Sequence, residues 1–180
     1  MNYPLCADEL GRVNALRDLH ILDTCPEPTF NAITENLADI FGVPVSAISL
    51  VDSERQWFKS VVGLDVCETD REVAFCNYTV AGGEIFEVTD AAIHPRFHAN
   101  PLVTEAPGIR YYCGAPIFVG EQAIGALCLI DMAPRKALGI KGRRVLSRFS
   151  AQVSRELEVR RLLKAAAGAV LASCDDRDVA

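Results

Sequence analysis

The sequence IRYYCGAPIFVGEQAIGALCLID at residues 109–131 decides the fold. It contains two runs with strand character, joined around Gly120 and Glu121, and almost no charged residue. So short a connection predicts an antiparallel β-hairpin. Successive side chains of a strand point to opposite faces of the sheet. In the first run, one face carries Ile109, Tyr111, Cys113, Ala115 and Ile117, and the other carries Tyr112, Pro116 and Phe118.

Both faces of this hairpin are apolar. In the second run, alternation places Ile124, Ala126, Cys128 and Ile130 on one face and Leu127 and Leu129 on the other. Antiparallel sheets commonly leave one face in water. Because neither face of this hairpin suits water, we predict helices over one face and a different layer, with room for a ligand, over the other.

The rest of the chain predicts alternating elements without repeats. Apolar periodicity and turn residues are the guides. They predict helices over residues 8–22 and 30–41, a second hairpin from strands 45–51 and 56–62, a short helix over 72–81, a short strand over 85–88, and a long irregular segment over 90–108. Long ordered loops in compact domains are often functional.

The C-terminal part predicts one long helix from about residue 141 to 173, because it has no proline. Its first apolar stripe consists of Leu146, Phe149, Val153 and Leu157, and a second, rotated stripe consists of Val159, Leu163, Ala166 and Val170. A helix this long outgrows its own domain, so its distal half either packs against a partner or remains partly frayed. We predict a parallel homodimer through the terminal helices, to which the stripe Leu10, Val13, Leu16 and Leu19 contributes. The alternative is that the long helix packs along the first helix of its own chain.

Composition narrows the class of protein. The chain has 180 residues, half of them hydrophobic, and a net charge of −6. These values are typical of one globular domain and disfavour nucleic acid as a partner. We expect a cytoplasmic protein without membrane contact, since we find neither a targeting segment nor a membrane-spanning stretch. Seven cysteines form no Cys-x-x-Cys pair, which predicts reduced thiols.

Many short segments together resemble the GAF domains that precede histidine kinase or diguanylate cyclase modules in bacterial signalling proteins. They include LDT at 22–24, SLVD at 49–52, QWFKSVVGLD at 56–65 and ALCLID at 126–131, with further matches at 75–76, 88–91, 95–97, 100–104, 108–112 and 114–116. The resemblance implies an α+β fold, with terminal helices on one face of a central antiparallel sheet and a short helix plus loops on the other. The expected organisation is an N-terminal helix region at 1–22, the GAF domain at 23–160, and an extended helix and tail at 161–180.

The resemblance implies a sensor and leaves its ligand open. Tyr78 stands where related sequences commonly have a histidine after Phe-Cys, and no cysteine precedes a histidine as in bilin-carrying members. The Asn-Lys dipeptide that begins the cyclic-nucleotide signature is also missing. His94 and His98 have a metal-ligand spacing, but Pro95 interrupts a helix there, so we expect neither a metal nor a cofactor.

Aromatic side chains with a few polar ends are typical of small-molecule sites. We predict that such residues line one cavity on the face opposite the terminal helices: Trp57, Cys76, Tyr78, Asp90, Phe97, Tyr111 and Cys113. The expected function is that of a stand-alone, dimeric, ligand-binding sensor without its own output domain. The sequence leaves two interpretations of this sensor open: it acts in trans on a histidine kinase or diguanylate cyclase, or it is the detached sensor of a larger ancestral protein.

The alternative is a thiol-dependent enzyme of the free methionine sulfoxide reductase type, a group of proteins with the GAF fold. Cys76, Cys113 and Cys128 are the candidate thiols. This chemistry needs a stabilised thiolate and a second thiol within disulfide reach. No motif in the sequence demands catalysis, so we expect a binding domain.

Overall fold

A six-stranded sheet forms the centre of the protein, with strand order β3-β2-β1-β6-β5-β4. Every pair of neighbouring strands is antiparallel. The computed structural model describes residues 3–175, and side chains up to residue 167. The strands are β1 (Val45–Val51), β2 (Arg55–Val62), β3 (Glu68–Asp70), β4 (Phe86–Val88), β5 (Tyr111–Val119) and β6 (Gln122–Asp131).

The two predicted hairpins are confirmed. β5 and β6 pair from Tyr111 opposite Asp131 to Val119 opposite Gln122, and β1 pairs with both β2 and β6. The prediction for Ile124 was wrong. The β5–β6 register shifts after Ile117, which gives β6 an extra residue, so Ile124 joins Leu127 and Leu129 on the same face.

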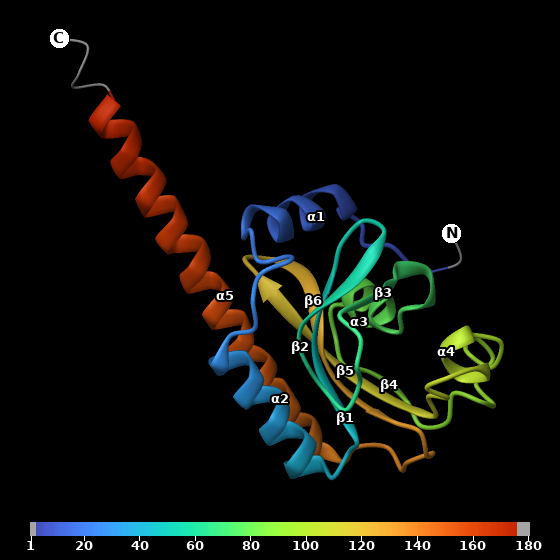
Figure 1. Cartoon of the computed structure of the whole chain (residues 1–180). Helices are drawn as coiled ribbons and strands as arrows, with labels where there is room; N and C mark the ends of the chain where they lie inside the picture. Colours follow the sequence, from blue (N-terminus) through green and yellow to red (C-terminus); the bar gives the residue numbers. More distant parts are fainter. Residues whose placement is uncertain (1–2, 176–180) are drawn as a thin grey trace.

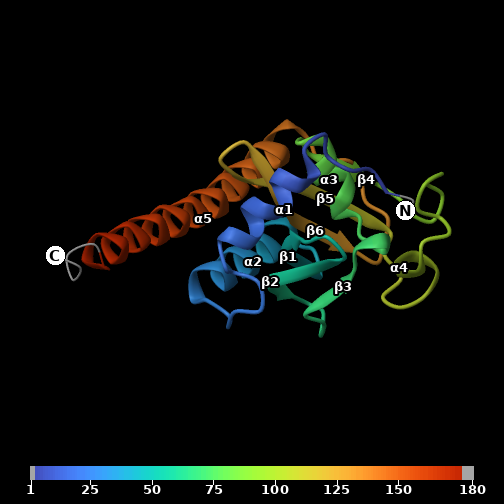
Figure 2. The same cartoon turned by 90° about the horizontal axis from the view of Figure 1, so that it is seen from above.

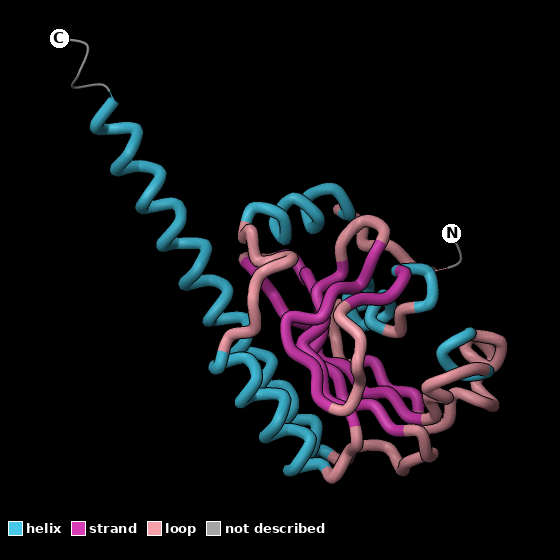
Figure 3. The backbone as a smooth tube through the Cα atoms, in the orientation of Figure 1, coloured by secondary structure: helices cyan, strands magenta, loops and turns pink. Residues whose placement is uncertain are grey.

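The helices lie on both sides of the sheet. They are α1 (Glu9–Asp18), α2 (Pro28–Phe41), α3 (Cys76–Gly82), α4 (Pro101–Thr104) and α5 (Ile140–Asp175), with a 3₁₀ turn at Arg71–Val73. Figures 1 and 3 show α2 and the first half of α5 side by side along one face, α1 across one end, and α3 and α4 on the other side. This arrangement confirms the predicted α+β architecture.

The sheet separates two hydrophobic cores. The core beneath α1, α2 and α5 contains Leu16, Leu37 and Leu146 together with the side chains on one face of β5 and β6. The core on the opposite face includes Phe75 and Phe97. Both faces of the central hairpin are therefore covered, as its apolar alternation predicts.

Helix α5 extends well beyond the sheet. Its 36 residues correspond to about 54 Å at the usual rise of an α-helix. Leu146, Val153 and Leu157 are buried against the domain, whereas Val159 and Leu163 are 53% and 66% exposed. Figure 2 shows the distal half of the helix leaving the body of the protein. Val170, part of the predicted second stripe, falls outside the side chains that the structure describes.

Within residues 3–175, none of the helices combines the length and the apolar character needed to cross a membrane.

Candidate functional site

A cavity of about 320 Å³ lies on the sheet face opposite α2 and α5. This volume is at the lower end of the range for small-molecule sites. The sheet supplies one wall, and the start of α3, the segment after β2 and the loop before β5 supply the others. Its apolar lining includes Phe58, Leu64, Val66, Phe75, Leu102 and Ile130. Among the described residues that line it, none is charged.

The loop before β5 is held in place by polar contacts to the backbone. Asn100 caps α4 by accepting a hydrogen bond from the Leu102 backbone N–H, and its Nδ2 donates to the Val73 carbonyl at 2.9 Å. Arg110 donates from Nη1 to the Val103 carbonyl at 2.9 Å. Long loops are otherwise mobile, so these contacts give the cavity a defined wall.

Gln56 places a polar amide at the apolar cavity. Its Nε2 donates to Thr69 Oγ1 at 3.2 Å, while Oε1 is buried and has no hydrogen-bond partner among the described residues. Rotating the amide by 180° exchanges Oε1 and Nε2, so that Nε2 instead of Oε1 lacks a hydrogen-bond partner. A buried polar atom without a partner costs about 1–3 kcal/mol. A ligand with a complementary polar group would remove this cost.

Two thiols also line the cavity. The Sγ atoms of Cys76 and Cys128 lie 3.3 Å apart. Tyr112 donates from Oη to Cys76 Sγ at 3.3 Å, and its oxygen lies 2.9 Å from Thr79 Oγ1. The hydroxyl of Tyr112 on β5 therefore connects the sheet to α3 at both Cys76 and Thr79.

The two thiols differ in acidity. Burial raises the pKa of Cys76, but the hydrogen bonds with Cys128 and Tyr112 oppose burial, and that pKa lies below its usual value. At Cys128, burial and the neighbouring Cys76 both act to raise the pKa well above its usual value. Cys76 is thus the sulfur of the pair that more readily loses its proton.

The predicted shared cavity of seven residues was wrong. Only Cys76 lines it. Phe97 lies on the same side of the sheet but does not line the cavity. Its ring stacks on Phe75, with 4.1 Å between ring centroids. The ring of Tyr78 packs edge-to-face with Phe97, with 5.0 Å between ring centroids. The carboxylate of Asp90 accepts a hydrogen bond from the Ala92 backbone N–H.

Trp57, Tyr111 and Cys113 lie on the opposite face, in the core beneath the helices. Tyr111 donates a hydrogen bond to Glu87 Oε1 at 2.9 Å. Burial and the Glu87 charge raise the pKa of Cys113 to about 12, so its thiol stays protonated. The prediction assigned these residues of β2 and β5 to the wrong face of the sheet. Because both faces are apolar, alternation alone does not tell which face the helices cover.

Sequence reasoning left out several residues that line the cavity. Gln56 carried a usable signal, since strand alternation places it on the same face as Phe58, which also lines the cavity. The hairpin register was a second signal, because it places Tyr112 and Cys128 on one face of the sheet. Leu102 belongs to the 90–108 segment that was expected to be functional, and part of that segment does line the cavity.

The comparisons with known proteins agree with this architecture. The GAF domain family model matches residues 26–157. A cyclic di-GMP phosphodiesterase of Pseudomonas aeruginosa is 37% identical over 148 residues, which are 82% of this chain and 25% of that protein. The chain thus spans about a quarter of that relative's length.

Solved structures with low sequence identity share the fold. The GAF domain of an Acinetobacter phosphoenolpyruvate-protein phosphotransferase superposes with a TM-score of 0.61 at 19% identity, covering 85% of this chain and 94% of that one. The free methionine-R-sulfoxide reductase of Neisseria meningitidis, solved with its substrate, has a TM-score of 0.62 at 16% identity, with coverages of 91% and 99%. From the family match and the six-stranded antiparallel fold together, we conclude that the chain belongs to the GAF domain family, of the type found in signalling proteins.

Proposed function

We propose that this GAF domain is a sensor that binds a small, mainly apolar molecule in the cavity beside α3, and that it works by binding rather than by catalysis. The observation that carries the proposal is the mainly apolar lining of the cavity, to which Gln56 contributes an amide whose buried Oε1 has no hydrogen-bond partner among the described residues. Apolar walls supply affinity, and a single polar group orients the ligand. In the orientation that the structure gives this amide, the atom without a partner is Oε1, an acceptor, so the proposed ligand class is an apolar molecule with one hydrogen-bond donor.

Strand β2 offers a route from the cavity to the long helix. Phe58 lines the cavity, and the next residue, Lys59, points to the opposite face. Lys59 pairs with Glu27, which also pairs with Arg160 on α5. A ligand that displaces Phe58 moves the backbone that carries Lys59. The proposed signal is the resulting shift of α5 relative to the sheet.

The exposed distal face of α5 is where we place the output. Val159, Leu162 and Leu163 form an apolar surface beyond the domain, and pairing with the same helix of a second copy buries it. We propose a parallel homodimer in the cytoplasm. A histidine kinase or a cyclic di-GMP enzyme module is the proposed signalling partner, the latter supported by the Pseudomonas aeruginosa relative.

A thiol-dependent reductase is the second candidate function. The contact between Cys76 and Cys128 is the observation that favours it, because a reductase of this kind needs two thiols within reach. Turnover of free methionine sulfoxide that disappears in Cys76→Ser would establish this function. A protein that binds the probes described below without such turnover is the binding domain that we propose.

Two fluorescent probes of matched shape test the ligand class. N-phenyl-1-naphthylamine has an N–H between its rings, and 1-benzylnaphthalene has a CH₂ there. We expect the amine to bind more tightly. Gln56→Leu should weaken amine binding about tenfold, the equivalent of one net hydrogen bond, and should leave binding of 1-benzylnaphthalene unchanged.

Gln122→Leu is the matched control, because Gln122 bonds Asp8 at the far end of the hairpin. It should leave the affinity for both probes unchanged. Equal loss of both probes in Gln56→Leu would contradict the role of the amide. Absence of saturable binding of either probe to the wild-type protein would contradict the cavity as a site.

A further inference from the structure

We infer that Cys76 and Cys128 form a dithiol that hydroperoxides convert to a disulfide, so that the cavity wall carries a reversible oxidation site. This inference does not depend on the proposed ligand. It rests on the position of the two sulfur atoms and on their access to the cavity. It concerns the oxidation of this protein itself and requires no turnover of a sulfoxide.

The two sulfurs are placed for bonding. Their separation of 3.3 Å has to shorten to about 2.05 Å in a disulfide. Cys76 is the first residue of α3, and Cys128 lies in the middle of β6, which contacts α3. Closing the pair therefore needs a small shift of one short helix toward the sheet.

The cavity gives an oxidant access to this pair. Both cysteines are buried, yet both line the cavity, and its rim includes the exposed residues Val66 and Ala106. Hydrogen peroxide is small enough to enter. Cys113 offers the internal comparison, since it is equally buried but faces the other core.

The reaction balances in two steps. The Cys76 sulfur attacks one oxygen of the hydroperoxide and breaks the O–O bond, and the second oxygen leaves as water or an alcohol with the thiol proton. The Cys128 sulfur then attacks the Cys76 sulfenic acid, forms the S–S bond and releases water. The two thiols lose two electrons, and the hydroperoxide gains them. A dithiol reductant reverses the result.

The experiment uses the full chain with Cys25 and Cys67 replaced by serine, which removes the two cysteines that are exposed among those whose side chains the structure describes. The protein is treated with hydrogen peroxide, denatured and titrated for thiols. We expect the remaining five thiols to fall to three and to return to five after reduction with dithiothreitol.

Mapping identifies the bonded pair. Trypsin alone leaves Cys113 and Cys128 on one peptide, 111–135, so digestion with both trypsin and a glutamate-specific protease is needed. Cleavage after Glu121 then separates Cys113 from Cys128, and cleavage after Glu72 and Glu84 frees Cys76 on peptide 73–84. The expected product joins peptides 73–84 and 122–135 through a bond that reduction breaks.

Two further variants sharpen the result. Cys128→Ser should stop the reaction at a Cys76 sulfenic acid that dimedone traps, and Cys113→Ser should form the same cross-link as its parent. Because the cross-link is also read in the parent chain, a variant that fails to fold leaves the test intact. If hydrogen peroxide lowers the number of titratable thiols without forming the cross-link between peptides 73–84 and 122–135, or does not lower that number at all, the inference is overturned.

Discussion

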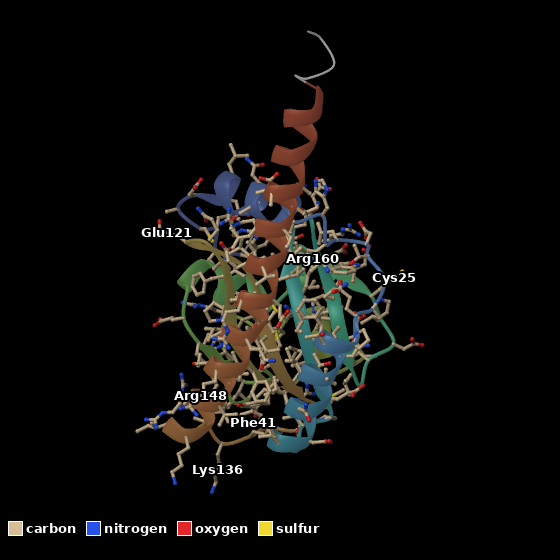
Figure 4. All side chains as sticks on the ribbon, turned by 90° about the vertical axis from the view of Figure 1, so that its left-hand side faces the viewer. Cys25, Phe41, Glu121, Lys136, Arg148 and Arg160 are labelled. Atoms are coloured by element: carbon tan, nitrogen blue, oxygen red, sulfur yellow. The ribbon has the colours of Figure 1, made fainter. Side chains whose placement is uncertain are left out.

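Lys59 Nζ lies 2.7 Å from Oε1 of Glu27, and this ion pair connects the sheet to the segment before α2. The same carboxylate oxygen lies 2.5 Å from an Arg160 nitrogen on α5. The Lys59 side chain is fully buried and also donates to Thr24 Oγ1 at 2.8 Å and to the Cys25 carbonyl at 2.7 Å. Figure 4 labels Cys25, in the loop before α2, and Arg160, on α5.

This arrangement predicts unequal effects of two alanine substitutions. Glu27→Ala leaves the buried Lys59 charge without its carboxylate and should lower the free energy of unfolding by about 2 kcal/mol. Arg160→Ala removes a partly exposed partner and should cost about 1 kcal/mol or less. Urea denaturation measures both, and a larger loss in Arg160→Ala would contradict this account of the ion pair.

Dimerisation should depend on the distal half of α5. Leu163→Glu places a charge in the proposed seam and should raise the dimer dissociation constant at least about tenfold, because an unpaired carboxylate resists burial. Trp57 fluorescence should show that the sheet remains folded. Arg148→Glu, on an exposed position near the other end of the helix (Figure 4), is the control and should leave the dimer intact. Sedimentation measures association, and a monomeric wild type at micromolar concentration would exclude the seam.

Gly125 should not tolerate a side chain. A Cβ atom there would lie 2.2 Å from the Ser49 carbonyl oxygen, which belongs to the neighbouring strand. Gly125→Ala should therefore destabilise the protein by about 1–3 kcal/mol. Gly139→Ala is the matched control, since nothing lies within 4 Å of its added Cβ, and its effect should stay within about 0.5 kcal/mol. Thermal denaturation measures both variants, and equal changes in their unfolding temperatures would show that the β1–β6 contact is not tight.

Glu9 should stabilise the fold in a pH-dependent way. Burial raises the pKa of Glu9, but hydrogen bonds with Arg12 and Arg71 outweigh burial and lower it to about 2. A lowered carboxyl pKa contributes stability that is fully present above the unfolded value of about 4.5 and is lost as the pH falls toward 2.

Glu9→Gln should accordingly cost about 1–2 kcal/mol at pH 6, a value reduced by solvent screening of this partly exposed group. The gap to wild type should narrow between pH 4.5 and pH 3. Urea titrations across this range measure the gap, with the exposed Glu84→Gln as control. A gap that stays constant with pH would refute the assignment to Glu9.

The fold was predictable because local patterns agreed with each other. The turn at Gly120 and Glu121 set the central hairpin, and its apolar faces required two covering layers. The face of Ile124 was not predictable from alternation, because a register shift after Ile117 changes the parity of β6. The long helix could be recognised from the absence of proline together with its stripes.

The site was predictable only in part. Cys76 was identified, but Tyr111 was chosen where Tyr112 lines the cavity, since two adjacent tyrosines on a doubly apolar strand look equivalent in sequence. Gln56 and Leu102 come together only through tertiary packing, 46 positions apart in the chain. Such tertiary contacts depend on the conformation of the loops, which the periodicity of the sequence does not describe.

Hydrogen–deuterium exchange of the full chain, with and without saturating N-phenyl-1-naphthylamine, tests the central claim that the cavity beside α3 is the sensory site. We expect slower exchange in residues 64–76 and 102–112, which form its walls, together with a change in α5 beyond Leu157. Protection confined to α2 and the first half of α5, which cover the opposite face of the sheet, or saturable probe binding that leaves 64–76 and 102–112 unaffected, would contradict this claim.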